Sequence, residues 1–372
     1  MNKHVLITGG AGFIGSHLAD ALLERGARVR VLDNLLPQVH GEDCTRPVYL
    51  ADDVELIAGD VRDPAAVRRA LDGVDVVFHL AAMVGVGQSM YQLSDYMAVN
   101  GLGTAVLLEA LIERPVERLV VASSMSVYGE GLYRDVAGEL RPGRERSMGQ
   151  LQRAEWELLD ETGRPLEPVA TPEWKTPSLA SVYALSKYDQ ERLCLMVGGA
   201  YGIPTVALRL FNVYGTRQAL SNPYTGVLAI FASRLLNGNP PLIFEDGLQR
   251  RDFVSVRDVA QACVLAAESA LAVGHTMNIG SGASHTVAGI AERMAHVLGR
   301  ETVAAHVTGK YRVGDIRHCF ADIGRARQLL GYAPQVTLDD GLADLAVWLE
   351  GQIAIDRVEH ASRELAVRGL TV

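Results

Sequence analysis

The stretch that decides the fold of this chain is VLITGGAGFIGSHL, residues 5–18. It opens with three apolar residues, two of them β-branched, which is typical of a strand buried on both faces. Four glycines follow within seven positions, and apolar residues then recur at helical spacing. The predicted order is strand, glycine turn, helix. Gly10, Gly12 and Gly15 match G-x-G-x-x-G, and Gly9, Gly12 and Gly15 match G-x-x-G-x-x-G.

Such a turn binds dinucleotides, because a side chain there would hold the pyrophosphate away from the backbone N–H groups and the positive end of the helix. Asp33 ends the next apolar run, eighteen positions beyond Gly15. A carboxylate at that distance accepts the ribose 2′-hydroxyl and repels a 2′-phosphate, which favours NAD over NADP. The competing interpretation is an ordinary turn followed by an Asp cap.

Further strands are predicted at residues 54–57, 75–80 and 116–122, alternating with helices. This alternation predicts an α/β fold, a Rossmann-type doubly wound parallel sheet with its ligand crevice at the carboxyl ends of the strands. Asp60 follows one strand and is a candidate both to accept from adenine, with Val61 over the ring, and to cap the helix from Pro64; the two roles are compatible. His79 is interpreted as a packed histidine.

Ser124 leaves the last of these strands at the crevice, and SVYALSK, residues 181–187, opens a later helix. Tyr183 and Lys187 are four residues apart and share one helical face. A tyrosine normally ionises near pH 10, but a neighbouring ammonium and a cationic nicotinamide favour phenolate, so Tyr183 can act as a base. A hydroxyl donor such as Ser124 can bind the same substrate oxygen. A surface tyrosine–lysine pair is the alternative.

Bulk properties exclude several classes of function. The net charge of −9 argues against a nucleic-acid binder. The four cysteines are widely scattered, so neither a zinc site nor a disulfide framework is predicted, and we expect no metal. No uninterrupted apolar run approaches eighteen residues, so no membrane association and a cytoplasmic location are expected.

These motifs resemble the extended short-chain dehydrogenase/reductases of the nucleotide-sugar epimerase and dehydratase family. The resemblance runs nearly end to end and includes TGGAGFIG (8–15), HLAA (79–82), SSMSVYG (123–129), YALSK (183–187), LRLFNVYG (208–215), RRDFVSVRD (250–258), NIGSG (278–282) and YRVGD (311–315). It implies bound NAD, a nucleotide-diphosphate sugar substrate and a homodimer formed through a helical bundle.

The resemblance also implies site residues. Catalysis falls to Ser124, Tyr183 and Lys187. Cofactor contacts fall to Gly9, Gly12, Phe13, Ile14, Gly15, Asp33, Asn34, Asp60, Val61, Leu80, Ala81, Ala82, Asn100, Tyr183 and Lys187. Substrate contacts fall to Ser124, Met125, Asn212, Phe244, Arg251 and Arg312. Two arginines facing a diphosphate also agree with charge and geometry.

Members of this family share hydride transfer from C4 of the sugar and diverge afterwards. The 4,6-dehydratases carry an Asp-Glu pair directly after the catalytic hydroxyl residue, and the related decarboxylases keep a glutamate at the second place. Here Met125 and Ser126 stand there, so we expect a 4-epimerase that returns the hydride to the opposite face. Residues 218–226 and the insertion resemble the dTDP-L-rhamnose 4-epimerase branch.

Other functions stay open at this point. The alternatives are a UDP-glucose, UDP-N-acetylglucosamine or UDP-glucuronate 4-epimerase, a 4-ketosugar reductase, or a non-catalytic dinucleotide-binding protein.

Two domains are expected, a dinucleotide-binding domain at 1–211 and a smaller substrate-binding α/β lobe at 212–372, interleaved with the first. An insertion at about 130–178 separates Gly129 from Tyr183, with a helical pattern at 148–161. A lid, an oligomer contact and a passive surface insertion are all compatible with its position.

Overall fold

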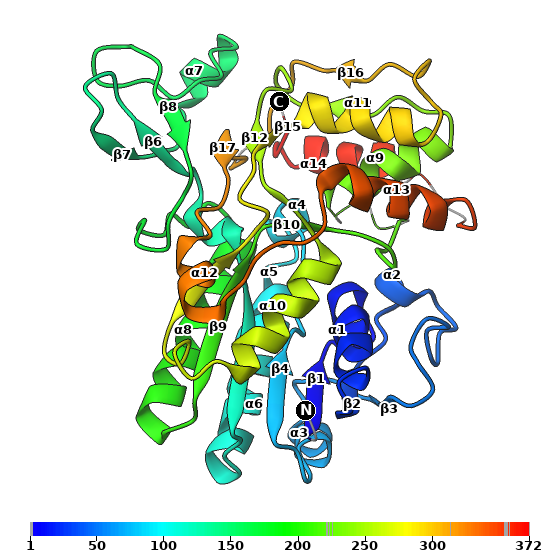
Figure 1. Cartoon of the computed structure of the whole chain (residues 1–372). Helices are drawn as coiled ribbons and strands as arrows, with labels where there is room; N and C mark the ends of the chain where they lie inside the picture. Colours follow the sequence, from blue (N-terminus) through cyan, green and yellow to red (C-terminus); the bar gives the residue numbers. More distant parts are fainter. Residues whose placement is uncertain are drawn as a thin grey trace.

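A seven-stranded parallel sheet forms the centre of the structure, a computed structural model that describes residues 3–220, 222, 224, 226–312, 314–352, 356 and 358–371 (Figure 1). The strand order is β14-β9-β5-β4-β1-β2-β3. The chain adds β2 and β3 on one side of β1 and then adds β4 and the later strands on its other side. The strands are β1 (His4–Thr8), β2 (Arg28–Asp33), β3 (Glu55–Ala58), β4 (Val76–His79), β5 (Arg118–Ser124), β9 (Thr205–Leu210) and β14 (Thr276–Ile279). The predicted doubly wound α/β fold is confirmed.

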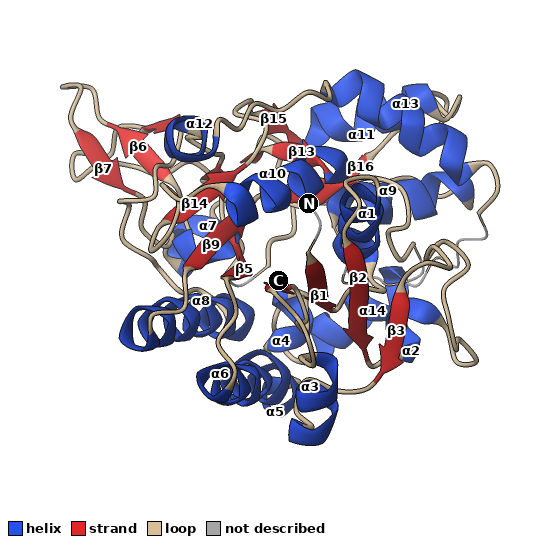
Figure 2. Cartoon of the chain, turned by 60° about the horizontal axis from the view of Figure 1, so that its bottom comes forward, coloured by secondary structure: helices blue, strands red, loops and turns tan. Residues whose placement is uncertain are grey.

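Helices cover both faces of this sheet (Figure 2). One layer holds α1 (Phe13–Leu23), α10 (Val256–Glu268) and α12 (Gly324–Leu330); the other holds α3 (Pro64–Ala70), α6 (Gly103–Glu113) and α8 (Val182–Tyr201). Side chains alternate across a strand, so Val5 and Ile7 pack into the first layer and Leu6 packs into the second. The continuous apolar run that predicts the first strand reflects this burial on both sides.

Three consecutive elements, α5 (Leu93–Tyr96), η1 (Met97–Leu102) and α6, form one continuous helical run. Its middle part, η1, is a π-helix, a form found mostly as single turns at functional sites. Within the described residues this run is long and apolar enough to cross a membrane, but 56% of its window is buried inside the protein. Such burial is typical of a core helix.

Two short helices, α2 (Pro37–His40) and α4 (Val86–Ser89), follow β2 and β4.

The second half of the chain builds a smaller lobe over the crevice. It also contributes β14 to the sheet and α10 and α12 to one of the helix layers that cover it. Its helices are α9 (Val227–Leu236), α11 (Val287–Val297), α13 (Leu338–Leu349) and α14 (Val358–Val367). Its strands are β10 (Asn212–Tyr214), β11 (Leu242–Ile243), β12 (Arg250–Arg251), β13 (Phe253–Ser255), β15 (His285–Thr286), β16 (His306–Val307) and β17 (His318–Cys319). Its core joins α9, α11 and α13. The two parts are therefore interleaved, and the boundary at 211 stays a prediction.

The insertion forms a separate small unit beside the lobe (Figure 1). After the 3-10 helix η2 (Met125–Tyr128) come β6 (Leu132–Arg134), β7 (Leu140–Pro142), α7 (Met148–Gln152) and β8 (Glu167–Val169). Its strands pair antiparallel in the order β7-β6-β8. The predicted helix at 148–161 is therefore too long, because the helix ends at Gln152.

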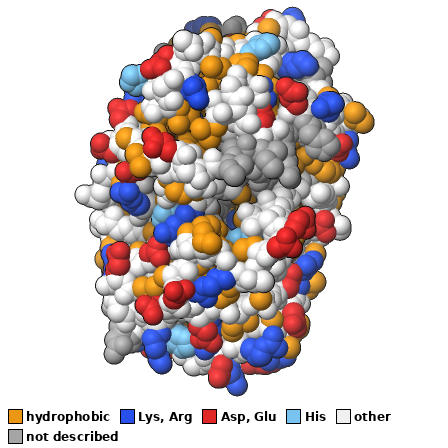
Figure 3. Space-filling model, turned by 90° about the vertical axis from the view of Figure 1, so that its right-hand side faces the viewer, with side chains coloured by type: hydrophobic (Ala, Val, Ile, Leu, Met, Phe, Trp, Pro, Cys, Tyr) orange, Lys and Arg blue, Asp and Glu red, His pale blue; other side chains and the backbone are white. Residues whose placement is uncertain are grey.

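Acidic and basic side chains are interspersed over the face shown in Figure 3. This distribution differs from the single-sign stripe that binds a nucleic-acid backbone.

Candidate active site

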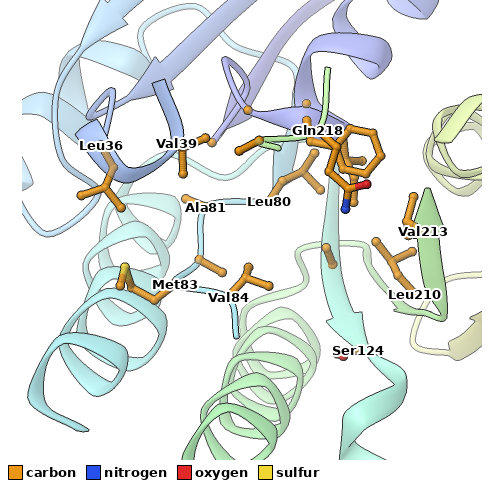
Figure 4. Close-up of a pocket in the computed structure, with 18 of the residues that line it drawn as sticks. Leu36, Val39, Leu80, Ala81, Met83, Val84, Ser124, Leu210, Val213 and Gln218 are labelled. Carbon is orange, nitrogen blue, oxygen red and sulfur yellow. The ribbon is translucent and has the colours of Figure 1, made fainter. Parts of the chain in front are cut away.

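A cavity of about 410 Å³ lies at the carboxyl ends of the parallel strands. Residues at or just after the ends of β1, β2, β4, β5 and β9 line it, namely Gly9, Asp33, Leu80, Ser124 and Leu210. Figure 4 shows apolar side chains around this space, with Leu36 and Val39 on one side and Val213 on the other. The crevice is where the doubly wound topology predicts it.

Most of the predicted site residues meet in this cavity. Those that line it are Gly9, Gly12, Phe13, Ile14, Gly15, Asp33, Asn34, Asp60, Val61, Leu80, Ala81, Ala82, Ser124, Tyr183, Lys187 and Asn212. The predicted residues that do not line it are Asn100, Met125, Phe244, Arg251 and Arg312. Within the described residues, no group of three or more His, Cys, Asp or Glu side chains is arranged to hold a metal ion.

The glycine turn leaves no room for side chains. Gly9 has φ +69°, and a Cβ there would lie 2.8 Å from the backbone of Ala81. A Cβ on Gly15 would lie 2.5 Å from the Cα of Gly10. Helix α1 begins at this turn with Gly12 as its N-cap and no side-chain cap. The first turn of the helix is thus open to a phosphate, and the residues present fit a dinucleotide.

Asp33 is buried at the end of β2 and is held in place by two backbone groups. Its carboxylate accepts from the N–H of Ala11 at 3.0 Å and from that of Leu35 at 2.9 Å. His40 Nε2 lies 3.8 Å from the same carboxylate, but burial lowers the pKa of His40 while Asp33 partly opposes the shift. A neutral His40 leaves the negative charge of Asp33 facing the cavity, which favours NAD over a 2′-phosphate.

Asp60 does not cap the helix that follows it, so that interpretation was wrong. Asp63 is the N-cap of α3, and its carboxylate accepts from the N–H of Ala65. The carboxylate of Asp60 instead accepts hydrogen bonds from the guanidinium and the backbone N–H of Arg62. These bonds lower the pKa of Asp60 to about 2. Asn34 adds a bond of 3.3 Å. Asp60 stays ionised at the cavity wall, where an amino group could donate to it.

Ser124 and Tyr183 lie together in the lining of the cavity and hydrogen-bond to each other. Burial raises the pKa of Tyr183, while hydrogen bonding with Ser124 lowers it. Ser124 Oγ accepts from both the N–H and the hydroxyl of Ser126, at 3.2 and 2.9 Å. Its own proton is therefore available to donate toward Tyr183 or a ligand oxygen. Tyr96 packs edge-on against the Tyr183 ring, with centroids 6.4 Å apart, and fixes its plane.

Lys187 is buried one helical turn after Tyr183, and its ammonium donates to the side-chain carbonyl of Gln190. Burial lowers the pKa of Lys187 to about 8. The amide nitrogen of Gln190 lies 2.8 Å from His79 Nε2, and Thr8 Oγ1 lies 2.7 Å from His79 Nδ1. Burial lowers the pKa of His79 to about 3, so the ring is neutral. His79 is a packed histidine that holds the amide supporting Lys187.

Asn100 lies one layer behind the cavity, in the π-helix. Its side chain accepts from Met83 N at 2.7 Å and donates to Met83 O at 3.1 Å. It also donates to Ser186 Oγ at 2.9 Å. Asn100 therefore joins the loop after β4 to the helix that carries Tyr183 and Lys187. A direct cofactor contact by Asn100 stays a prediction.

The predicted substrate residues form a second group toward the lobe. Asn212 lines the cavity, and its buried Oδ1 has no hydrogen-bond partner in the described part of the chain. The Arg312 guanidinium stacks 4.2 Å from the centre of the Phe244 ring, and its buried Nε also lacks a partner. Each of these two atoms is therefore free to bind a polar ligand group. Arg251 is held by backbone carbonyls of the lobe.

Several lining residues were not predicted. Met83 and Val84 extend the loop after β4, and Leu36 and Val39 extend the loop after β2. Their position directly after a strand is a signal that could have identified them, because these loops meet at the carboxyl edge of the sheet. Tyr224 also lines the cavity and comes from a loop far away in the sequence. It belongs to the stretch 218–226 that carries part of the family resemblance, but no strand or helix pattern there predicts that it lines the cavity.

The chain matches the model of the NAD-dependent epimerase/dehydratase family over residues 5–148 and 162–280. A dTDP-L-rhamnose 4-epimerase from Burkholderia thailandensis is 36% identical over 356 residues, covering 94% of this chain and 96% of that protein. The structure of a Thermotoga maritima UDP-glucose 4-epimerase with UDP-glucose superposes with a TM-score of 0.76 at 30% identity, covering 93% and 98% of the two chains.

A UDP-glucuronic acid 4-epimerase from Bacillus cereus, solved with UDP-glucuronic acid and NAD, also has a TM-score of 0.76. It is 28% identical and covers 93% of this chain and 99% of its own. The gap in the family match, 149–161, lies inside the insertion.

Proposed function

The chain belongs to the NAD-dependent epimerase/dehydratase family, and on that premise we propose that it is a nucleotide-sugar 4-epimerase. Its best substrate pair is dTDP-L-rhamnose and dTDP-6-deoxy-L-talose. The observation that carries the proposal is the shared cavity, which is lined both by Ser124, Tyr183 and Lys187 and by the glycine turn. A sugar hydroxyl bound at Tyr183 would therefore share this cavity with a dinucleotide held at the glycine turn.

Bound NAD supplies a hydride acceptor that can return the hydride to the same carbon. Tyr183 takes the proton of the C4 hydroxyl and gives it back after the sugar has turned over. Lys187, as an ammonium, lowers the cost of the phenolate form of Tyr183. Ser124 donates a hydrogen bond to the same oxygen, since its own acceptor sites are occupied by Ser126. Removal of the proton from the C4 oxygen and its return need no acid or base besides Tyr183, whichever face of the sugar receives the hydride.

The residues after Ser124 support epimerisation over elimination. Met125 is buried and carries no titratable group, and the hydroxyl of Ser126 is occupied by its bond to Ser124. Neither can act as the acid or base that removal of water at C5 and C6 requires. The 4-keto sugar can therefore only be reduced again.

The composition of the cavity supports a 6-deoxy sugar over a uronate. Among its described lining residues, only Lys187 and His40 can carry positive charge, and burial lowers the pKa of both. A uronate carboxylate would need a cation that these residues do not offer. Val84 and Leu210 instead present apolar surface that suits a methyl group. The 36% identity to the Burkholderia enzyme points to the same sugar.

A homodimer is part of the proposal. Exposed apolar side chains gather on α5, η1 and α8, which pack against one another on the same side of the sheet: Leu93, Met97, Leu102, Leu185 and Met196. Such a surface is typical of an interface between protein chains. Light scattering after gel filtration should give twice the chain mass, and a monomer would contradict this assignment.

The decisive experiment incubates the purified protein with dTDP-L-rhamnose, UDP-glucose, UDP-N-acetylglucosamine and UDP-glucuronate, each followed by NMR without added cofactor. We expect inversion at C4 of dTDP-L-rhamnose and NAD(H) release on denaturation. Elimination products would show that Met125 and Ser126 have been misinterpreted. Turnover only with added NADP⁺, with the absorbance of NADPH rising as the C4 hydroxyl is oxidised, would favour a ketosugar reductase running in reverse. A Tyr183→Phe variant should still bind the sugar nucleotide but not turn it over.

A further inference from the structure

The insertion at 130–178 grips one segment of the distant carboxyl-terminal half, residues 315–322. Gly131 N donates to His318 O at 2.8 Å, and Thr171 N donates to Phe320 O at 2.8 Å. The carboxylate of Glu130 accepts from the backbone N–H of Arg317 at 2.7 Å. Both ends of the insertion thus bind the same stretch of backbone (Figure 1).

The tip of the insertion reaches the side chains of this segment. Glu157 Oε1 accepts from Arg317 Nε at 3.1 Å and from Nη2 at 2.5 Å. Its other oxygen accepts from His318 Nε2 at 3.0 Å. Arg317 is fully buried, and on its far side it bonds to Asp246 at 2.6 Å and to Glu245 at 2.9 Å. Arg317 therefore locks the insertion to the lobe with charge-assisted bonds.

A second arginine of the insertion works in the same direction. Arg146 donates to the carbonyl of Asp315 at 3.3 Å and pairs with Glu245 at 2.8 Å. Beside it, the ring of Trp156 packs against Tyr311, with centroids 6.3 Å apart. Tyr311 directly precedes Arg312 in the chain. The contacts of the insertion thus reach Tyr311 as well as the segment 315–322.

The opposite side of this segment holds Arg251. Its guanidinium donates to the carbonyls of Ile316 and Arg317, the latter at 2.9 Å, and its Nη2 lies 3.5 Å from Asp315. The backbone that the insertion fixes is thus the backbone that orients Arg251. Planar guanidinium recognition depends on orientation, so a small shift of these carbonyls changes how Arg251 meets an anion.

We propose that the insertion is a strut that positions Arg251 for the diphosphate of the substrate, with Glu157 as its key positioning residue. The inference rests on the proposed function and on the predicted contact of Arg251 with that diphosphate. The contacts favour a strut over a lid, because they tie the insertion to the lobe, and none of Glu130, Arg146 or Glu157 lines the cavity. It also gives the insertion a role that a passive surface loop would not have.

The test measures binding of dTDP, and of UDP in parallel, to the NAD-loaded protein by calorimetry. Glu157→Gln removes the charge while keeping the shape of a partly exposed side chain. Glu155→Gln is the matched control, because Glu155 lies two residues away and pairs with exposed Arg153. We expect Glu157→Gln to weaken dTDP about threefold to tenfold, with KM raised and kcat retained. Glu155→Gln and the NAD content should not change.

A double-mutant cycle with Arg251→Met separates an effect of Glu157 that is transmitted through Arg251 from an effect that reaches dTDP binding by another route. If Glu157 acts through Arg251, the effect of Glu157→Gln on dTDP binding disappears in the Arg251→Met background. An equal effect in both backgrounds, or a loss of stability with unchanged affinity, overturns the strut. If Arg251→Met alone leaves dTDP affinity unchanged, the diphosphate assignment itself fails. Glu157→Asp is the second variant, and restoration of affinity by its shorter carboxylate is the expected result.

Discussion

The amide of Gln190 is the most informative single position for testing the proton-transfer chemistry. It accepts from the buried ammonium of Lys187 and is itself held by His79. Gln190→Met keeps the volume of the side chain but removes the acceptor. Gln190→Glu keeps an acceptor and adds a negative charge. The two variants should move the pKa of Lys187 in opposite directions.

The size of the effect follows from the contact. A hydrogen bond to a charged group contributes about 1.5–3 kcal/mol, and one pKa unit corresponds to about 1.4 kcal/mol. Loss of the Gln190 acceptor should therefore lower the pKa of Lys187 from about 8 by a further one to two units. A group with a lowered pKa loses its proton earlier as pH rises. In Gln190→Met, Lys187 would then be largely neutral at pH 7.5, and the phenolate of Tyr183 would lose its support.

The assay is the pH dependence of kcat for the sugar-nucleotide epimerisation, from pH 5.5 to 9.5, with NAD content measured on the same samples. The alkaline limb should move to lower pH in Gln190→Met and to higher pH in Gln190→Glu. At pH 7.5 the methionine variant should lose about tenfold to a hundredfold in kcat. Coincident profiles for the wild type and both variants, with full NAD content, would refute the role given to Lys187.

Two further predictions concern the scaffold of the site. Gly15→Ala places a Cβ 2.5 Å from the Cα of Gly10 and from Gly9 O, so the turn must shift. NAD content and Tm should both fall, and the free energy of unfolding should decrease by about 1–3 kcal/mol. A variant with full NAD content and an unchanged melting curve would contradict this. Arg209→Met leaves the buried carboxylate of Glu191 without its partner at 2.7 Å, and urea unfolding should show a loss of about 3–5 kcal/mol. Adding Glu191→Gln should recover part of that loss, and no recovery would argue against the pair.

The cofactor half of the site could be predicted from the sequence because its signals are local. Gly9, Asp33 and Ser124 each stand at or just after the end of an apolar strand, and parallel strands bring their carboxyl ends to one edge. The strand pattern alone therefore assembles these residues. The four-residue spacing of Tyr183 and Lys187 adds a helical face, and it too requires no distant contact.

The substrate half could not be derived in this way, because its geometry depends on distant pairings. Arg251 is oriented by carbonyls some 65 positions further along the chain, a contact created by the pairing of β12 with β17. Only the resemblance to a family pointed to it. The helix expected at 148–161 failed for a related reason: the chain turns at Ala154, with φ +55°, and Trp156 and Glu157 then reach the lobe. Tertiary contacts outweighed a helical pattern of apolar residues.

The edge of the cavity bears on the choice between a recycled and an exchanged cofactor. The side chains of Gln38 and Gln88 exchange two hydrogen bonds of 3.1 Å, and Gln38 also donates to Asn222 at 3.1 Å. Gln38 lies in α2 after β2, Gln88 lies in α4 after β4, and Asn222 lies in the loop that carries Tyr224. Side chains in or near each of these three segments line the cavity. A reductase must part such contacts, or work around them, each time a spent cofactor leaves. An epimerase regenerates NAD in place, so cross-links between the loops cost it nothing in turnover. The amide contacts are thus compatible with a cofactor that is regenerated in place.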